Sequence, residues 1–294
     1  MAGNGGSVEQ ETPASANERV ALSQRVVELR PPTSRTTLGL GELWRSRELV
    51  FWLALRDIQV RYKQTALGIA WVLLQPLVTM GVFSIVFGRL AKLPSDGVPY
   101  PLFVLAGLVP WTFFASALTN SAQSLVLNVN LLTKVYFPRL AIPIAAALAS
   151  LVDLALATLL LVVATCVWGP SPTARLLALV PLMALCLAAV LGVGLWLAAT
   201  NVRYRDVRYV VPFLVQLWLF ATPVAYSSSL VPSRWRPLYA LNPMVGVIDG
   251  YRWAVLGVRL QGPTVAVSLC SVAALLLFGV WTFRRQERSF ADMV

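Results

Sequence analysis

Six long apolar stretches, separated by charged residues, limit the possible folds of this chain more than any other feature. A helix needs about 20 mostly apolar residues to cross the hydrocarbon core of a membrane, and every stretch reaches that length. Polar residues do not alternate with apolar ones as they do in barrel strands, so helices are predicted. The stretches are Gln64–Gly88, Gly97–Thr133, Leu140–Ala174, Leu176–Val202, Tyr209–Ser233 and Leu260–Phe283.

The fold class predicted from these stretches is an all-α integral membrane protein with six transmembrane helices. The spans are expected at about residues 66–89, 102–126, 142–168, 176–200, 209–227 and 262–283. The composition agrees, because 57% of the residues are hydrophobic and 13% are charged, whereas soluble domains carry about 25% charged residues.

The net charge of +11 could indicate a nucleic-acid partner, but the positions of the basic residues argue against one. Lys and Arg lie between the apolar stretches, where they set the orientation of membrane helices. An even number of spans places both termini on one face, and that face carries most of the 24 basic residues. We therefore expect both termini in the cytoplasm and no nucleic-acid partner.

The segments outside the spans differ in composition. Residues 1–36 are polar and are expected to form a disordered cytoplasmic tail. Residues 37–63 have helically spaced apolar residues and are expected to form an amphipathic helix on the inner membrane surface, or one that packs on a partner. Residues 64–294 form the transmembrane domain. Within it, residues 237–257 are interrupted by Asn242-Pro243 and are expected to form short re-entrant helices in the outer leaflet, before the sixth span.

Several kinds of chemistry are missing from the sequence. The chain has no histidine, the commonest general base and metal ligand. None of Lys63, Lys92 and Lys134 follows a glycine, so the chain lacks the Gly-Lys-Ser/Thr phosphate loop of an ATPase. We predict no catalytic residue, no metal site and no cofactor in this chain. If ATP drives it, the ATPase is another chain.

Asp153 is an acid within an apolar stretch, where a carboxylate is a functional candidate because leaving it charged is costly. The other interpretation is a protonated or hydrogen-bonded aspartate that packs between helices. We favour the second interpretation because no basic partner lies in a neighbouring apolar stretch. It predicts that Asp153→Asn leaves transport largely intact.

Two polar motifs and one loop lie at the predicted inner edge of the spans. Arg56-Asp57 and Arg205-Asp206 are either charges that set topology or a polar knot between the surface helix and an inner loop. The loop 128–139 mixes amide, basic and large apolar residues. It either offers apolar anchors such as Phe137 to a soluble partner or lies half-buried among the headgroups.

Aromatic residues gather near the middle of two predicted spans. An aromatic-lined passage would suit a glycan, because aromatic faces pack on the apolar faces of sugars. For each residue alone, core packing or lipid contact is the alternative. The candidate channel residues are Trp111, Phe113, Phe114, Trp218 and Phe220.

Taken together, the motifs resemble the membrane subunit of bacterial ABC-2 polysaccharide exporters, the group that exports O-antigen, capsule and teichoic acid. The resemblance covers about residues 40–294. The motifs that carry it are Arg56-Asp57, residues 61–65, Leu67-Gly68, Trp71, Gln75-Pro76, residues 107–114, residues 130–139, Arg205-Asp206, Asn242-Pro243, Tyr251-Arg252 and residues 287–292.

The resemblance implies a homodimer in the bacterial inner membrane, bound to two copies of a cytoplasmic ATPase that holds ATP and Mg. It also implies a lipid-linked glycan as substrate and a gate at the outer face. It assigns contact with the ATPase to Asn130, Lys134, Tyr136, Phe137, Pro138 and Arg139, with which we group Arg56, Asp57, Arg205 and Asp206. It assigns the outer gate to Pro223, Asn242, Pro243, Tyr251 and Arg252.

Three other functions stay open. The first is an ABC-2 permease for a drug or a small lipid, which would share the six spans. The second is an intramembrane transferase acting on a lipid-linked sugar, which would need clustered acids or histidines that this chain does not supply. The third is a structural scaffold or passive channel, which the coupling-like loop 128–139 disfavours.

Overall fold

Helices dominate the part of the chain that the computed structural model describes, which is residues 40–63, 69–129, 131, 137–171, 173–204, 206–287 and 290. The chain divides into two units, Met1–Thr37 and Leu38–Val294, and all described residues belong to the second. The predicted tail at 1–36 therefore lies outside the described residues. So do four predicted site residues, which are Asn130, Lys134, Tyr136 and Arg205.

Five of the predicted spans are helices that are long and apolar enough to cross a membrane. The first is α4 (Ile69–Phe83) with a π-helical continuation, Ser84–Leu90. The others are α5 (Tyr100–Leu127), then α7 (Ala141–Ala149) followed by α8 (Leu151–Trp168), then α9 (Leu179–Arg203) with a preceding 3-10 turn (Ala174–Ala178), and α13 (Gly262–Glu287).

The fifth predicted span, 209–227, is a shorter helix than expected. Its helix is α10 (Val207–Phe220), with 14 residues, which at 1.5 Å per residue is about 21 Å long, less than the hydrocarbon core. Beyond Phe220 the backbone turns, and the carbonyl oxygens of Val224 and Tyr226 accept hydrogen bonds from the Arg252 side chain. Hydrogen bonds from Arg252 thus replace main-chain bonds that a longer helix would form.

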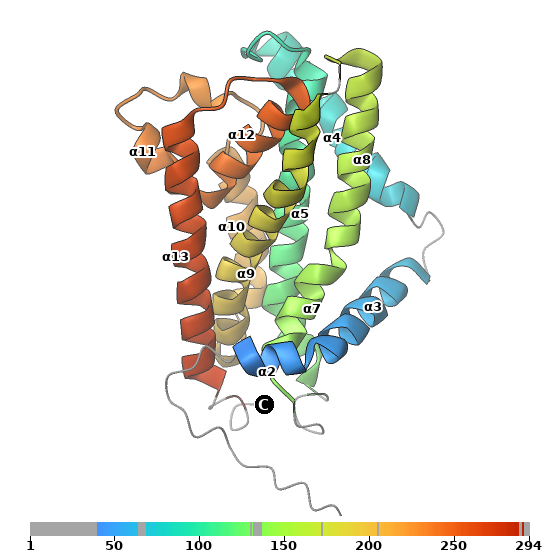
Figure 1. Ribbon diagram of the computed structural model, residues 1–294, viewed down its shortest axis with the longest axis vertical. Helices are drawn as coiled ribbons and strands as arrows, with labels where there is room; N and C mark the ends of the chain where they lie inside the picture. Colours follow the sequence, from blue (N-terminus) through green and yellow to red (C-terminus); the bar gives the residue numbers. More distant parts are fainter. Residues whose placement is uncertain are drawn as a thin grey trace, which may run out of the picture. The chain divides into compact units, whose positions relative to one another are not determined.

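Helix α5 forms the centre of the bundle (Figure 1). It contacts α4, α7, α8, α9, α10 and α12. In its apolar stretch, 78% of the residues are buried inside the subunit, against 6% in the apolar stretch of the first span. Helices α9 and α13 also pack closely, because a Cβ atom added at Gly279 would lie 2.1 Å from the carbonyl oxygen of Gly192. Such small residues let helix backbones approach in membranes.

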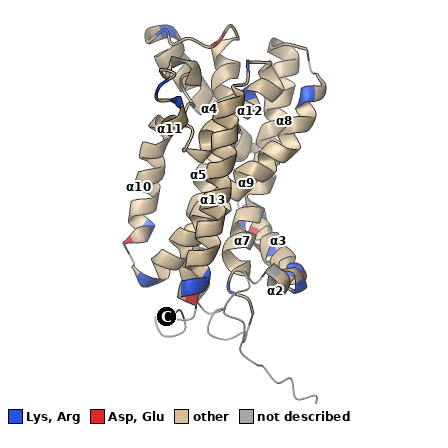
Figure 2. Ribbon diagram, turned by 60° about the vertical axis from the view of Figure 1, so that its left-hand side comes forward, with Lys and Arg blue, Asp and Glu red and all other residues tan. Residues whose placement is uncertain are grey.

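The predicted surface helix is present as α2 (Leu40–Arg45) and α3 (Arg47–Lys63). Val50 and Ala54 of α3 are buried against α7, while Phe51, Trp52 and Val60 are exposed. The apolar residues of α3 are therefore spread around the helix and not confined to one face. Most charged residues lie towards the two ends of the bundle, and the helices between carry few (Figure 2).

Two short helices precede α13, as the sequence predicts. They are α11 (Arg236–Tyr239) and α12 (Pro243–Leu256), and a 3-10 turn (Ser228–Leu230) comes before them. Helix α12 begins with Asn242 as its N-cap and with Pro243 in its first turn, and it ends at Gly257, whose φ is 72°. These are favourable start and stop signals for a helix. All but two of its residues are buried.

Candidate functional site

Arg252 organises one end of the bundle, which we call the α12 cap: α12 with the segments 92–98 and 221–230. The side chain of Arg252 is 1% exposed. Its Nη2 donates to the carbonyl oxygen of Val224 at 2.9 Å, its Nη1 to that of Tyr226 at 3.3 Å and its Nε to that of Phe103 at 3.4 Å. The guanidinium also lies 3.6 Å from the centre of the Phe103 ring. The arginine thereby joins α12 to α5 and to the turn after α10.

Asn242 holds the same turn from the start of α12. Its side-chain Nδ2 donates to the carbonyl oxygen of Ala221 at 3.2 Å and to the Thr222 hydroxyl at 2.9 Å. Its Oδ1 accepts from the backbone N–H of Met244. The buried Pro223 lies in this turn. Four predicted gate residues, Pro223, Asn242, Pro243 and Arg252, are therefore brought together.

Tyr251, the fifth predicted gate residue, faces another way. Its buried hydroxyl lies 3.5 Å from the hydroxyl of Thr158 on α8.

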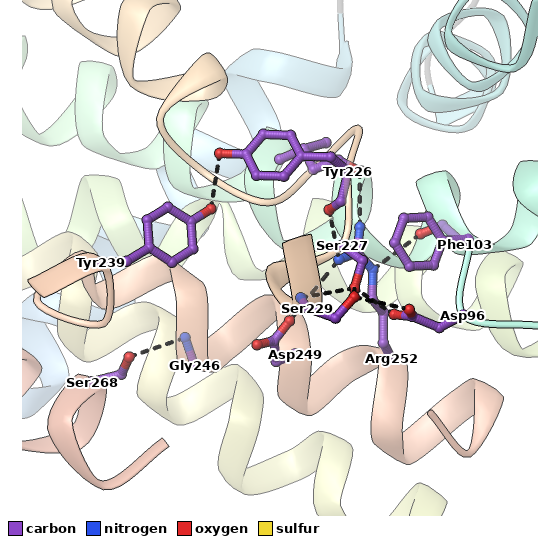
Figure 3. A network of polar contacts seen from close by, with 11 residues as sticks. Asp96, Phe103, Tyr226, Ser227, Ser229, Tyr239, Gly246, Asp249, Arg252 and Ser268 are labelled. Atoms are coloured by element: carbon purple, nitrogen blue, oxygen red, sulfur yellow. Dashed lines mark hydrogen bonds and ion pairs between the residues drawn. The ribbon is translucent and has the colours of Figure 1, made fainter. Parts of the chain in front are cut away.

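A second set of polar contacts joins the segments within the α12 cap to one another (Figure 3). The carboxylate of Asp96 accepts hydrogen bonds from the hydroxyls of Ser227 and Ser229. Asp249 Oδ1 lies 4.0 Å from Nη1 of Arg252, which stands one turn further along α12. Asp96 thus joins the 92–98 segment to the chain that Arg252 holds, so three segments that are distant in sequence form one polar network.

Phe137 and Arg139 lie at the opposite end of the bundle, in what we call the α13 junction: Phe137, Arg139, Glu287 and Phe290. Arg139 Nη1 donates to the carbonyl oxygen of Glu287 at 2.6 Å, and the backbone N–H of Arg139 donates to Glu287 Oε1 at 3.3 Å. Phe137 is half-buried and packs against two apolar clusters, one with α3 and one with α13. Phe137 and Arg139 thus contact other helices of the chain.

Asp153 has a basic partner that the search of the apolar stretches missed, because the partner lies on α3. Arg61 forms an ion pair with the Asp153 carboxylate, and the Tyr62 hydroxyl donates to the same group. Burial, followed by the hydrogen bond to Asp153, raises the pKa of Tyr62, so its hydroxyl stays a neutral donor. The assumption that Asp153 stands without a basic partner is therefore wrong, while its interpretation as a hydrogen-bonded aspartate between helices agrees with the structure.

Arg56, one residue of the predicted polar knot, contacts the end of α5. Arg56 donates to its neighbour Asp57 at 2.8 Å and to Asn128 Oδ1, at the end of α5, at 3.1 Å. It thus joins α3 to Asn128 at the start of the segment 128–139. Arg205, the basic residue of the second motif, lies outside the described residues. Asp206 lies at the N-cap of α10 and makes no side-chain capping bond there.

The predicted channel aromatics do not line one space. Phe114 contacts Trp111 and Trp218 at centroid distances of 5.6 and 5.1 Å, and this trio belongs to the packed core between α5 and α10. Phe113 borders a cavity of about 500 Å³ between α3, α4, α5 and α8, whereas the Phe220 side chain is 63% exposed. Among the described residues, no three His, Cys, Asp or Glu side chains could hold a metal ion together.

Sequence reasoning missed four residues that the structure brings into these sites: Arg61, Asp96, Glu287 and Phe290. Arg61 and Glu287 stand in the motifs that carry the family resemblance, but their partners are 92 and 148 residues away along the chain. The sequence shows only that Glu287 follows the last apolar stretch. That position does not identify Arg139 as its partner.

Comparison with known proteins gives consistent matches. The profile of the ABC-2 type transporter family matches residues 48–256, from the second residue of α3 to the end of α12. The chain is 30% identical over 257 residues to the O-antigen export system permease protein RfbA of Myxococcus xanthus, covering 86% of this chain and 98% of that protein.

Two more distant relatives show the same overall match. The polysialic acid transport protein KpsM of Escherichia coli is 23% identical, over 81% of this chain and 93% of its own length. The inner membrane transport permease YadH of E. coli K12 is 28% identical, over 71% of this chain and 86% of its own length.

Proposed function

Because the chain belongs to the ABC-2 type transporter family, we propose that it is the membrane permease of an exporter that moves a lipid-linked polysaccharide across the bacterial inner membrane. It is a multi-pass membrane protein and a transport permease. The observation that carries the proposal is the similarity to an O-antigen export permease over 98% of that relative's length. The more distant similarity to a polysialic acid transport protein supports a glycan as cargo.

We propose six spans, with the short α10 as the fifth. Local thinning of the bilayer or snorkelling of the flanking residues compensates for the short length of α10 at modest cost. Helices α11 and α12 re-enter the outer leaflet, where their irregular backbone is covered by protein. This arrangement puts both termini and the α13 junction in the cytoplasm. Residues 1–36 form a cytoplasmic tail, 37–63 the surface helices and 64–294 the transmembrane domain.

The energy source of the exporter is a separate ATPase. This follows from the sequence, in which no lysine follows a glycine as a phosphate loop requires. The proposed assembly is a homodimer of this chain with two ATPase copies, which hold ATP and Mg. Within this chain, the segment 128–139 contacts the ATPase, including Asn130, Lys134, Tyr136, Phe137, Pro138 and Arg139. Arg56, Asp57, Arg205 and Asp206 support it from the neighbouring helix and loop.

The glycan path and its gate are part of the same proposal. The gate is the α12 cap, with Pro223, Asn242, Pro243, Tyr251 and Arg252. Of the proposed channel aromatics, we propose that Phe220, which is exposed, and Phe113, which borders the cavity, contact the substrate. Trp111, Phe114 and Trp218 hold α5 against α10.

The alternative is an ABC-2 permease for a drug or a small lipid. One observation favours it: the aromatic trio packs inside the subunit and offers no continuous sugar-binding wall. The similarity to YadH, whose name specifies no cargo, is compatible with it.

The test is to purify the chain with its candidate ATPase, reconstitute the complex in lipid and measure ATP turnover. Lipid-linked glycan extracted from the membranes of the source bacterium is the probe, and extracted phospholipid without glycan is the control. We expect the glycan to change the turnover and the phospholipid to leave it unchanged. A stable complex that responds only to hydrophobic drugs or phospholipid would favour the alternative, and failure to form any complex with an ATPase would contradict both.

A further inference from the structure

Arg139 and Glu287 each use their side chain to form a hydrogen bond with the main chain of the other residue. Arg139 lies just before α7, and Glu287 lies in the last described turn of α13. The guanidinium of Arg139 donates to the main-chain carbonyl oxygen of Glu287 at 2.6 Å. The Glu287 carboxylate accepts from the backbone N–H of Arg139 at 3.3 Å. Two helices that are 148 residues apart in sequence are thus joined end to end by a pair of reciprocal bonds.

Both bonds are electrostatically favourable. Each bond has one charged partner, the Arg139 guanidinium or the Glu287 carboxylate, which strengthens a hydrogen bond. A cation at the C-terminal end and an anion at the N-terminal end also complement the helix dipole. Arg139 supplies the cation to α13, and Glu287 supplies the anion to α7. A neutral side chain at either position would interact less favourably with the helix dipole, so charged residues suit this contact.

Other side chains hold the pair in place. Arg284 forms an ion pair with the second carboxylate oxygen of Glu287 at 3.0 Å. The Arg139 guanidinium lies 5.9 Å from the centre of the Phe290 ring, which contacts the Phe283 ring at 5.5 Å. Phe137 packs against the apolar cluster that contains Phe283 and Phe290. The segment at 137–139 is therefore attached to α13 by polar and apolar contacts together.

Helix α13 also reaches the α12 cap. The Ser268 hydroxyl donates to the carbonyl oxygen of Ala240 at 3.0 Å and accepts from the backbone N–H of Gly246 at 3.1 Å. The Ser271 hydroxyl donates to the carbonyl oxygen of Leu241 at 2.6 Å. Between these two ends, Gly279 lies against the backbone of Gly192 on α9. One helix thus contacts the 137–139 segment at its last turn and the chain around α12 at its first turns.

We propose that Glu287 is a positioning residue for coupling: with Arg139 it makes α13 move together with the 137–139 segment, so that displacement of this segment reaches the α12 cap. The proposal rests on the proposed function, in which the segment 128–139 contacts an ATPase. Coupling then has a direct route along α13, in addition to any route through α5.

The test compares variants of the complex between this chain and its candidate ATPase, reconstituted in nanodiscs. The readout is how far the membrane chain changes the ATP turnover of the ATPase relative to the ATPase alone. Loss of a charge-assisted hydrogen bond shifts an equilibrium about tenfold, so Glu287→Ala is expected to weaken that change about tenfold while the complex still assembles. Glu287→Gln keeps an oxygen acceptor for the Arg139 N–H and is expected to retain most of the effect.

Two further variants separate coupling from stability. Arg285→Ala removes an exposed charge on the same turn, beside Trp281 and away from Arg139, and is expected to behave as wild type. The double variant Arg139→Ala/Glu287→Ala is expected to weaken the effect more than either single variant, because Arg139→Ala removes the bond to the main chain of Glu287 and Glu287→Ala removes the bond to the main chain of Arg139. Melting temperature is recorded for each complex.

The inference would be overturned if Glu287→Ala behaved like wild type, or if its effect on ATP turnover fell only in proportion to its folded fraction. Either result would leave the proposed function intact. A wild-type chain that binds no ATPase would overturn both. The two failures are therefore distinguished by whether the wild-type complex forms.

Discussion

Each end of the bundle depends on an arginine that donates to main-chain carbonyl groups, but the surroundings of the two arginines differ. Arg252 in the α12 cap is 1% exposed and reaches three carbonyl oxygens on α5 and on the turn after α10. Arg139 in the α13 junction is half-buried and reaches one carbonyl oxygen at a helix end. Water can replace the contacts of Arg139 but not those of Arg252.

The comparison separates contacts that stabilise the fold from contacts that can transmit a movement. Removing a buried charged group leaves its former partners unsatisfied, at a cost of several kcal/mol. Removing a partly exposed one costs less, because solvent compensates. The α12 cap is thus expected to act as one rigid piece whose loss destabilises the protein. The α13 junction is expected to tolerate substitution structurally and to fail in coupling.

The largest expected effect comes from Arg252→Ala. The carbonyl groups of Phe103, Val224 and Tyr226 lose their donor in a buried place, and we expect a loss of about 3–5 kcal/mol in stability. Thermal unfolding of the detergent-solubilised protein measures it. Arg252→Lys is expected to recover little, because one ammonium group cannot replace the planar fork of donors.

The matched control is Arg234→Ala, which removes an exposed arginine near the same end of the bundle. It is expected to change stability by about 0.5 kcal/mol or less. If the two alanine variants melt alike, Arg252 does not hold the α12 cap.

A smaller effect is expected from Asp153→Ala, which removes the partner of Arg61. The two side chains are 18% and 31% exposed, so the loss is expected to be about 1–2 kcal/mol after allowance for solvent. Asp153→Asn keeps an oxygen acceptor and is expected to retain transport. A double-mutant cycle with Arg61→Ala measures the coupling of the pair, and a coupling energy near zero would show that the ion pair contributes nothing.

The smallest effect is expected from Asn242→Ala, at about 1 kcal/mol, which is typical for the loss of a helix N-cap. Asn242→Asp separates its two roles, since the carboxylate still caps α12 but no longer donates to Ala221 and Thr222. If Asp restores full stability, the cap alone matters. If it restores only part, the tie to the turn after α10 contributes as well.

The sequence was sufficient to predict a helical membrane protein and where most of its long helices begin and end. The predicted spans 102–126 and 142–168 agree closely with Tyr100–Leu127 and Ala141–Trp168, because charged or polar residues mark where an apolar helix leaves the membrane. The interruption at Asn242-Pro243 likewise predicted the start of α12. The end of α10 at Phe220 was not predictable from apolar length, since it depends on hydrogen bonds from distant residues.

The candidate sites were predictable only in part. The grouping of Pro223, Asn242, Pro243 and Arg252 was expected from the family resemblance, whereas Asp96 was not, because nothing in its neighbourhood indicates Ser227 and Ser229 as partners. Asp153 was found as an unusual acid, but its partner Arg61 lies outside the apolar stretches. The mid-span aromatics could not be divided into core and surface residues, since that depends on how α5 and α10 are rotated against each other.

By this proposal, the α13 junction transmits movement, whereas the α12 cap stabilises the fold. The most direct measurement is the amount of lipid-linked glycan exported per ATP hydrolysed by the complex reconstituted in vesicles, for wild type, Glu287→Ala and Arg285→Ala. Glu287→Ala is expected to give a ratio about tenfold lower than wild type, and Arg285→Ala an unchanged ratio. Equal ratios for all three proteins would show that Glu287 has no role in coupling.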